Sequence, residues 1–179
     1  MKNATPKLLV CYQRYVSPVG PLVLASAGDA LCLCDWLGKP SAERNKRRVA
    51  RLLNAEFVEA PSDIILRAAS QLDEYFAGRR TTFSLSLLPV GTDFQRSVWN
   101  ALLEIPFGET RSYKDIALRV GNVKAVRAVA QVVGMNPLSI ICPCHRVVGS
   151  DRSLTGFAGG LAAKKALLKL ENTVTDEHS

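Results

Sequence analysis

Residues 8–36 consist of short, mostly apolar runs separated by turn-forming Ser-Pro, Gly-Pro and Gly-Asp pairs. Such runs, bounded by glycine and proline, are typical of β-strands joined by tight turns. The pattern predicts an antiparallel meander of three strands over Leu8–Val16, Leu22–Ala27 and Leu31–Trp36. Two helices and a fourth, short strand should follow, over Glu43–Leu53, Ile64–Phe76 and Thr82–Leu88.

From about residue 92 the apolar spacing becomes helical, and capping residues or glycines flank the expected helices. These helices are Asp93–Leu103, Tyr113–Val120, Val123–Val133 and Leu161–Leu170. The second and third are joined by a turn at Gly121, which is the outline of a helix-turn-helix motif. The same outline occurs in helical proteins that bind nothing. Ser139–Val148 is expected to be extended.

Together these elements predict a two-domain α/β protein. An N-terminal domain, residues 1–89, should contain the antiparallel sheet and its helices. A mainly helical domain, residues 90–171, should carry the helix-turn-helix motif, and residues 172–179 should form a polar tail.

Positive charge is concentrated in one third of the chain. The 179 residues carry a net charge of +7, and residues 111–169 contain ten Lys and Arg but only two Asp and Glu. This distribution suits a surface that binds a polyanion, and it suits a solvated basic surface equally well. No apolar stretch is long enough to span a membrane and no secretion signal is evident, so we expect a cytoplasmic protein without membrane contacts.

The chain has five cysteines: Cys11, Cys32, Cys34, Cys142 and Cys144. The odd number favours reduced thiols, and the Cys-x-Cys spacing is too tight for paired zinc ligands. We therefore expect no metal site. The first three lie in strand-like runs and should be small buried hydrophobes.

The segment Pro143–Arg146 has the residue types that nucleophilic catalysis requires. A thiolate is the reactive form of cysteine, and cations at His145 and Arg146 would lower the pKa of Cys144. In an extended chain adjacent side chains point to opposite faces, so either a bridging water or a turn would be required to connect Cys144 with His145. A cysteine beside a histidine is otherwise more often incidental than catalytic.

The sequence Pro143–Val147 resembles the active-site signature of the O6-alkylguanine-DNA alkyltransferases. Further segments resemble this family in order and spacing across about residues 90–171: Gly91–Trp99, Ile105–Gly108, Ser112–Tyr113, Arg127–Val129, Asn136–Pro137 and Gly159–Leu161. The resemblance implies a ribonuclease H-like N-terminal domain. It also implies repair by direct reversal, in which one alkyl group moves from O6 of guanine, or O4 of thymine, to the protein. No cofactor is needed, and each molecule acts once.

The resemblance assigns four residues to the chemistry. Cys144 would accept the alkyl group, and His145 would pass the thiol proton through water to Glu171. Tyr113 would donate its hydroxyl to N3 of the guanine. Taken without the family, Glu171 is an acid near a helix end and Tyr113 an aromatic residue at a helix start.

Four further residues would form the guanine pocket. The carbonyl of Val147, with that of Cys144, would accept from the exocyclic amine of guanine, and Asn136 would tie the helix-turn-helix to the active-site loop. Phe157 and Ala158 would line the pocket, although some relatives have Tyr at the first position and many have Ser at the second.

The resemblance also implies that double-stranded DNA is bound through the minor groove. The target base must leave the stack before a buried thiol can reach it, and Arg127 matches the residue that fills the gap. The small residues Ala125 and Ala128 would allow close approach. The remaining expected DNA contacts are Ser112, Tyr113, Lys114 and Lys124. We expect a monomer, with cooperative binding along DNA left open.

Two alternatives remain at this point. A non-catalytic protein that senses alkylated bases would bind DNA without transfer, but relatives of that kind lack the acceptor cysteine. A cysteine hydrolase would turn over repeatedly on an ester or amide, and the sequence offers no evident oxyanion hole for one.

Overall fold

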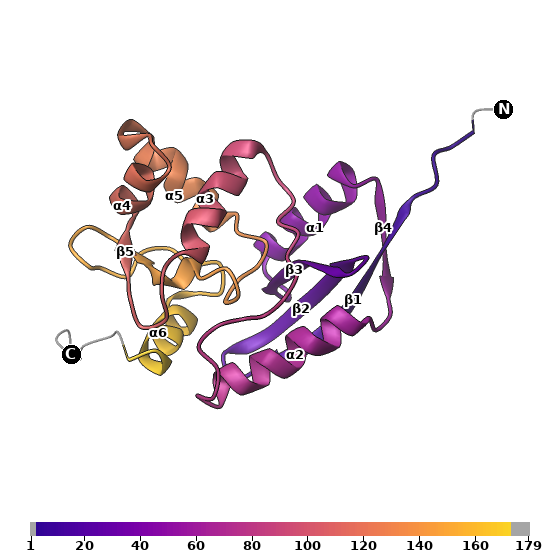
Figure 1. Cartoon of the computed structure of the whole chain (residues 1–179), viewed down its shortest axis with the longest axis horizontal. Coiled ribbons are helices and arrows are strands. Elements are labelled where there is room, and N and C mark those ends of the chain that lie inside the picture. The colour runs from indigo at the N-terminus through magenta and orange to yellow at the C-terminus, as the bar shows by residue number, and fades with distance from the viewer. Residues whose placement is uncertain (1–2, 173–179) are drawn as a thin grey trace.

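The computed structural model describes residues 3–172 as a sheet half and a helical half that share one core. Figure 1 shows the sheet and the helices that cover it on one side and the shorter helices of the C-terminal half on the other. The predicted polar tail lies outside the described residues, except for Asn172.

The three predicted strands form the expected meander. They are β1 (Leu8–Ser17), β2 (Gly20–Ala27) and β3 (Ala30–Trp36), and both pairings are antiparallel. The sheet also contains β4 (Ala55–Glu59), which pairs in parallel with β1 and gives the order β3-β2-β1-β4. The expectation of a purely antiparallel sheet is therefore wrong, because a helical crossover returns the chain alongside β1.

One helix covers each face of this sheet (Figure 1). α1 (Pro40–Leu52) packs Val49 against one face, with Val10 and Leu33. α2 (Asp63–Phe76) packs Leu72 and its apolar neighbours against the other face. α1 begins three residues before the predicted start, since Pro40 fits the first turn of a helix, where no backbone N–H is needed.

Two further expectations for this half need correction. Residues 82–88 form no strand; Leu87 makes only an isolated bridge with Leu31, where the chain crosses to the helical half. Of the cysteines expected to be buried, Cys32 and Cys34 are fully enclosed, but Cys11 is half-buried.

The C-terminal half contains the predicted helices. They are α3 (Asp93–Leu103), α4 (Tyr113–Arg119), α5 (Val126–Gly134) and α6 (Leu161–Leu170). A short turn of 3-10 helix, η1 (Val123–Ala125), precedes α5, and Gly121 turns the chain between α4 and η1 at a φ of 80°. Glycine adopts left-handed φ values without steric cost, so Gly121 allows the sharp turn of the helix-turn-helix.

The segment before the Cys-His pair is attached to the sheet. The Cys34 N–H donates to the Pro137 carbonyl at 2.8 Å, and the Ser139 N–H donates to the Cys34 carbonyl at 2.8 Å. The N-terminal half thus holds this segment at the free edge of β3. Within residues 3–172, no helix is long and apolar enough to cross a membrane.

Candidate active site

Cys144 lies in a tight turn and not in an extended segment. It begins η2 (Cys144–Arg146), and only Val147–Val148 of the predicted extended stretch form a strand, β6, which pairs with β5 (Arg111–Ser112). Four residues before Cys144, Ile140 has a φ of 72°, which is strained for a β-branched residue. Such strain persists only where the surroundings fix the backbone, and it is often found at functional sites.

Cys144 is 5% exposed, and burial raises the pKa of its thiol to about 11. The Asn136 side chain and the charge of Lys164 act against this rise. At neutral pH the sulfur is therefore protonated in the resting protein, and the proton has to leave when the sulfur attacks.

The two residues that follow Cys144, His145 and Arg146, belong to a buried ionic cluster around Glu171. Glu171 is 2% exposed; its Oε1 lies 2.9 Å from His145 Nε2 and accepts from Tyr75 at 2.7 Å. Arg146 donates Nε to Oε2 at 2.8 Å and an Nη atom to Oε1 at 2.9 Å. Arg146 also donates to the Ile105 carbonyl at 2.7 Å, so its guanidinium is bound on both sides.

The charges in this cluster follow from its contacts. Burial alone would raise the pKa of Glu171, but hydrogen bonds from His145 and Arg146 outweigh it and hold the pKa at about 2. Burial lowers the pKa of His145, so the imidazole is neutral at physiological pH. Because the ionised carboxylate can only accept, Nε2 carries the ring hydrogen and Nδ1 presents its lone pair. Nδ1 is buried without a hydrogen-bond partner in the described protein.

This arrangement corrects the source of positive charge expected near the thiol. His145 is neutral and the Arg146 guanidinium binds Glu171, so the side chain that supports the thiolate is Lys164. Lys164 is fully buried, and its Nζ donates to the carbonyls of Val147 at 2.6 Å and Thr155 at 3.0 Å.

Asn136 connects the end of the helix-turn-helix with the cysteine segment. Its side-chain amide donates to the Cys142 carbonyl at 2.8 Å, and its Oδ1 accepts from the Leu138 N–H at 2.9 Å. Asn45 of α1 donates to the backbone carbonyl of Asn136 at 3.3 Å and to the buried Asp35 carboxylate at 2.6 Å. The N-terminal half therefore fixes this connection from behind.

The loop that holds the expected pocket residues packs on the sheet half. Phe157 meets Trp36 edge to face, with 5.6 Å between ring centroids. A Cβ atom on Gly159 would lie 2.4 Å from the Trp36 ring, so only glycine fits there. Ala158, between them, is half-buried. Tyr113 approaches the loop from α4, and its hydroxyl accepts from Thr155 at 3.1 Å.

The predicted DNA contacts lie on the surface of the helix-turn-helix. Arg127 and Ala128 are exposed at the start of α5, whereas Ala125 is half-buried. Lys114 and Lys124 are also exposed. Ser112 caps α4 by accepting from the Asp115 N–H at 3.0 Å, which fixes the start of that helix.

Sequence reasoning missed three residues of the site. Tyr75 continues the helical spacing of Ala68 and Leu72, and this pattern could have placed it in the core, but not its contact with Glu171. Lys164 and Trp36 give no local signal, because their partners are distant in sequence. Among residues 3–172, no group of His, Cys, Asp and Glu is arranged to hold a metal ion.

The fold and the site define a two-half α/β protein with a helix-turn-helix motif beside a buried Cys-His-Glu array. The family profile described as "6-O-methylguanine DNA methyltransferase, ribonuclease-like domain" matches residues 10–89. The profile described as "6-O-methylguanine DNA methyltransferase, DNA binding domain" matches residues 93–173. The chain belongs to the 6-O-methylguanine DNA methyltransferase family, and its C-terminal half is the DNA-binding domain of that family.

Individual relatives match this chain over most of their own length. The methylated-DNA–protein-cysteine methyltransferase of Methanosarcina barkeri is 47% identical over 160 residues, which cover 89% of this chain and 96% of the relative. The enzyme of the same name from Haemophilus influenzae is 44% identical over 161 residues, covering 89% of this chain and 85% of the relative. The crystal structure of Mycobacterium tuberculosis OGT in complex with DNA matches with a TM-score of 0.78 at 42% identity, covering 92% of this chain and 93% of that one.

Proposed function

We propose that this protein repairs alkylated DNA by moving the alkyl group of O6-alkylguanine, and of O4-alkylthymine, to Cys144. The observation that carries the proposal is a buried thiol beside His145, whose imidazole is oriented by the ionised Glu171. Family membership and the relatives' names support the same activity.

The Cys144 sulfur attacks the alkyl carbon, and a C–S bond forms as the C–O6 bond breaks. The thiol proton passes through a bridging water to Nδ1 of His145, and Glu171 stabilises the resulting imidazolium through Nε2. The electron pair of the broken bond stays on the base, and the Tyr113 hydroxyl, donated to N3, offsets its charge. The product is a thioether, from which a thiolate is too poor a leaving group for water to displace, so Cys144 is consumed and each molecule acts once.

The guanine is selected by the backbone around the thiol. The carbonyls of Cys144 and Val147 each accept one protein hydrogen bond, from the Val147 N–H and from Lys164. A carbonyl oxygen has two lone pairs, so each can also accept from the exocyclic amine of guanine. Phe157 and Ala158 form the wall of this pocket, and Asn136 keeps the cysteine segment in register with α5.

DNA is bound through the minor groove by the helix-turn-helix. Arg127 enters the stack in place of the extruded base, and the small side chains of Ala125 and Ala128 allow the helix to approach. Ser112, Tyr113, Lys114 and Lys124 contact the adjoining backbone. We infer a monomer that acts in the cytoplasm without a cofactor; cooperative binding on DNA and the division at residues 89 and 90 stay predictions.

The test measures repaired DNA. A duplex with one O6-methylguanine is mixed with a limiting amount of protein, digested to nucleosides and analysed for recovered guanine. Recovery should equal the amount of protein and then stop, and Cys144→Ala should recover none while still binding the duplex. Lesion binding without recovery would favour the sensing alternative. Repeated turnover on an ester, with no recovery, would favour a hydrolase.

A further inference from the structure

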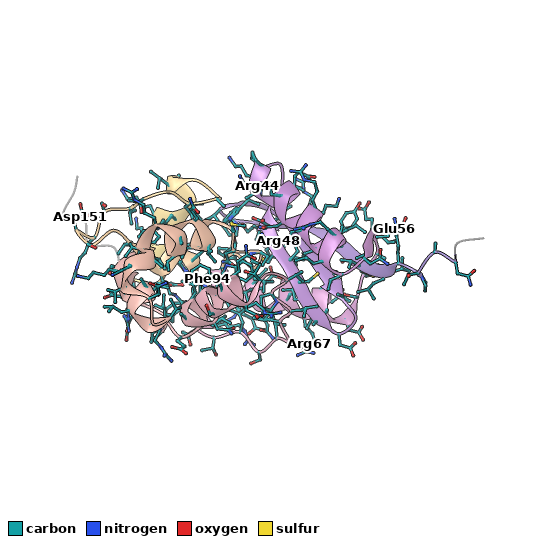
Figure 2. All side chains as sticks on the ribbon, turned by 90° about the horizontal axis from the view of Figure 1, so that it is seen from above. Arg44, Arg48, Glu56, Arg67, Phe94 and Asp151 are labelled. Atoms are coloured by element: carbon teal, nitrogen blue, oxygen red, sulfur yellow. The ribbon has the colours of Figure 1, made fainter. Side chains whose placement is uncertain are left out.

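A groove of about 410 Å³ lies between α1 of the N-terminal half and the C-terminal part of α5. Its walls on the α1 side are basic and polar, and those on the α5 side are small or polar except for Met135. The lining residues are Ser41, Arg44, Asn45, Arg48, Ala130, Gln131, Gly134 and Met135. In Figure 2, Arg44 and Arg48 lie where α1 approaches the C-terminal half.

The α5 side of this groove continues the surface that carries Arg127. Residues three, four and seven positions apart share one face of a helix, so Arg127, Ala130, Gln131 and Gly134 form a single stripe. Arg127, Gln131 and Gly134 are exposed and Ala130 is half-buried. The stripe therefore leads from Arg127 to the groove beside α1, and a duplex docked along it would extend towards α1.

α1 presents unpaired positive charge at that point. Its thirteen residues contain five Lys and Arg and a single acid, Glu43. Arg44 and Arg47 are exposed, lie one turn apart, and form no ion pair among the described residues. Lys46 is turned away, with its Nζ 5.1 Å from the centre of the Tyr12 ring.

α1 is also held firmly against the end of α5. Arg48 donates to the carbonyls of Val90 at 3.0 Å and Met135 at 3.1 Å, and its guanidinium lies 5.2 Å from the centre of the Trp99 ring. Asn45 adds its bond to the Asn136 carbonyl. The spacing between Arg44 and the DNA-facing stripe is therefore set by the fold before DNA arrives.

We propose that α1 of the N-terminal half is a second DNA-contact element, which binds the phosphate backbone of the duplex docked on α5 through Arg44 and Arg47. The partner is the polyanionic backbone and not the bases, because two exposed guanidinium groups on a helix surface recognise phosphates without reading sequence. This inference rests on the proposed binding of DNA by α5.

The experiment measures binding of an unmodified duplex by the full chain as a function of salt, in a Cys144→Ala background. The double variant Arg44→Gln, Arg47→Gln should bind several-fold more weakly at low salt. Its plot of log affinity against log salt should flatten by about 0.9 for each arginine that contacts a phosphate. The matched control, Arg67→Gln with Arg79→Gln, makes the same charge change at exposed positions of α2 and the loop after it, on the opposite side of the sheet. Figure 2 shows Arg67 and Arg44 at opposite edges of the molecule in that view.

A second readout separates DNA contact from an effect on the active site. With Cys144 intact, both double variants should react with free O6-methylguanine at the wild-type rate. An unchanged slope, an equal loss in the control pair, or a loss on the free base would each overturn the proposal. Binding to unmodified DNA requires no alkyl transfer, so this failure differs from failure of the repair function, which would appear as wild-type protein without a Cys144 adduct.

Discussion

At the scale of single residues, the site depends on the charge of Glu171. This carboxylate accepts from His145, Arg146 and Tyr75 in the protein interior. Glu171→Gln keeps the shape but removes the charge, which leaves the Arg146 guanidinium buried without a counterion. We expect a loss of about 3–5 kcal/mol in unfolding free energy and slow transfer. Urea unfolding and single-turnover rates measure these effects; wild-type values for both would contradict this role.

Arg127 should matter for base extrusion and not for chemistry. Arg127→Ala removes an exposed side chain at the start of α5, so transfer from a lesion in duplex DNA should fall far more than transfer from the free base. Lys124→Ala, one helical turn earlier and also exposed, controls for the loss of one charge. Equal losses on the duplex and the free base would refute a role in extrusion.

At the scale of elements, α6 positions the loop around the thiol through Lys164. Lys164→Met removes the buried cation near Cys144 and leaves the carbonyls of Val147 and Thr155 without their donor. We expect about 1–3 kcal/mol of destabilisation for each unsatisfied carbonyl, a higher thiol pKa and slower transfer. Lys165→Met alters an exposed neighbour and should change little. If both variants have a wild-type pH dependence of Cys144 alkylation, Lys164 does not support the thiolate.

The loop before α6 is positioned by contact with β3. Gly159→Ala would place a Cβ atom against the Trp36 ring, so the loop must move, at about 1–3 kcal/mol. Transfer should slow because Phe157 and Ala158 move with it. Gly156→Ala has no neighbour within 4 Å of the added carbon and serves as the control. Crystal structures or transfer rates that fail to distinguish the two variants would contradict this packing argument.

At the scale of the whole molecule, both halves contribute residues to the site. Acid should therefore destabilise the fold and the site together. The folded pKa of Glu171, about 2, lies below its ordinary 4.5, so its contribution to stability is complete above about pH 4.5 and is lost as the pH falls towards 2. The pKa of His145 is also lowered, so its contribution to stability is likewise lost on acidification, beginning as the pH falls below the ordinary value of 6.5. Unfolding free energy measured across this range should decrease on acidification, and less steeply in Glu171→Gln.

The sequence predicted those features that depend on local signals. Tight turns identify β1 to β3, and Thr92, Ser112 and Gly121 identify the ends of the C-terminal helices. β4 was missed because it pairs with β1, which is distant in the sequence. Thr82–Leu88 was misread as a strand because its apolar residues pack against the core, while only Leu87 forms a bridge to the sheet.

The chemistry at Cys144 and His145 was visible from their motif, but the support around it was not. Tyr75, Trp36 and Lys164 reach the site from elements far away in the chain. The roles of Tyr75 and Trp36 depend on how the two halves meet, and that of Lys164 on how α6 packs against the loop before it. These arrangements are properties of the folded molecule and not of any local pattern.

The most direct test of the account is intact-protein mass spectrometry after mixing with excess duplex that contains one O6-methylguanine. An unmodified duplex and the Cys144→Ala variant are the controls. We predict a mass increase of a single methyl group, which maps to Cys144 and does not rise further with time. An unmodified protein after full lesion binding, or a methyl group on another residue, would contradict it.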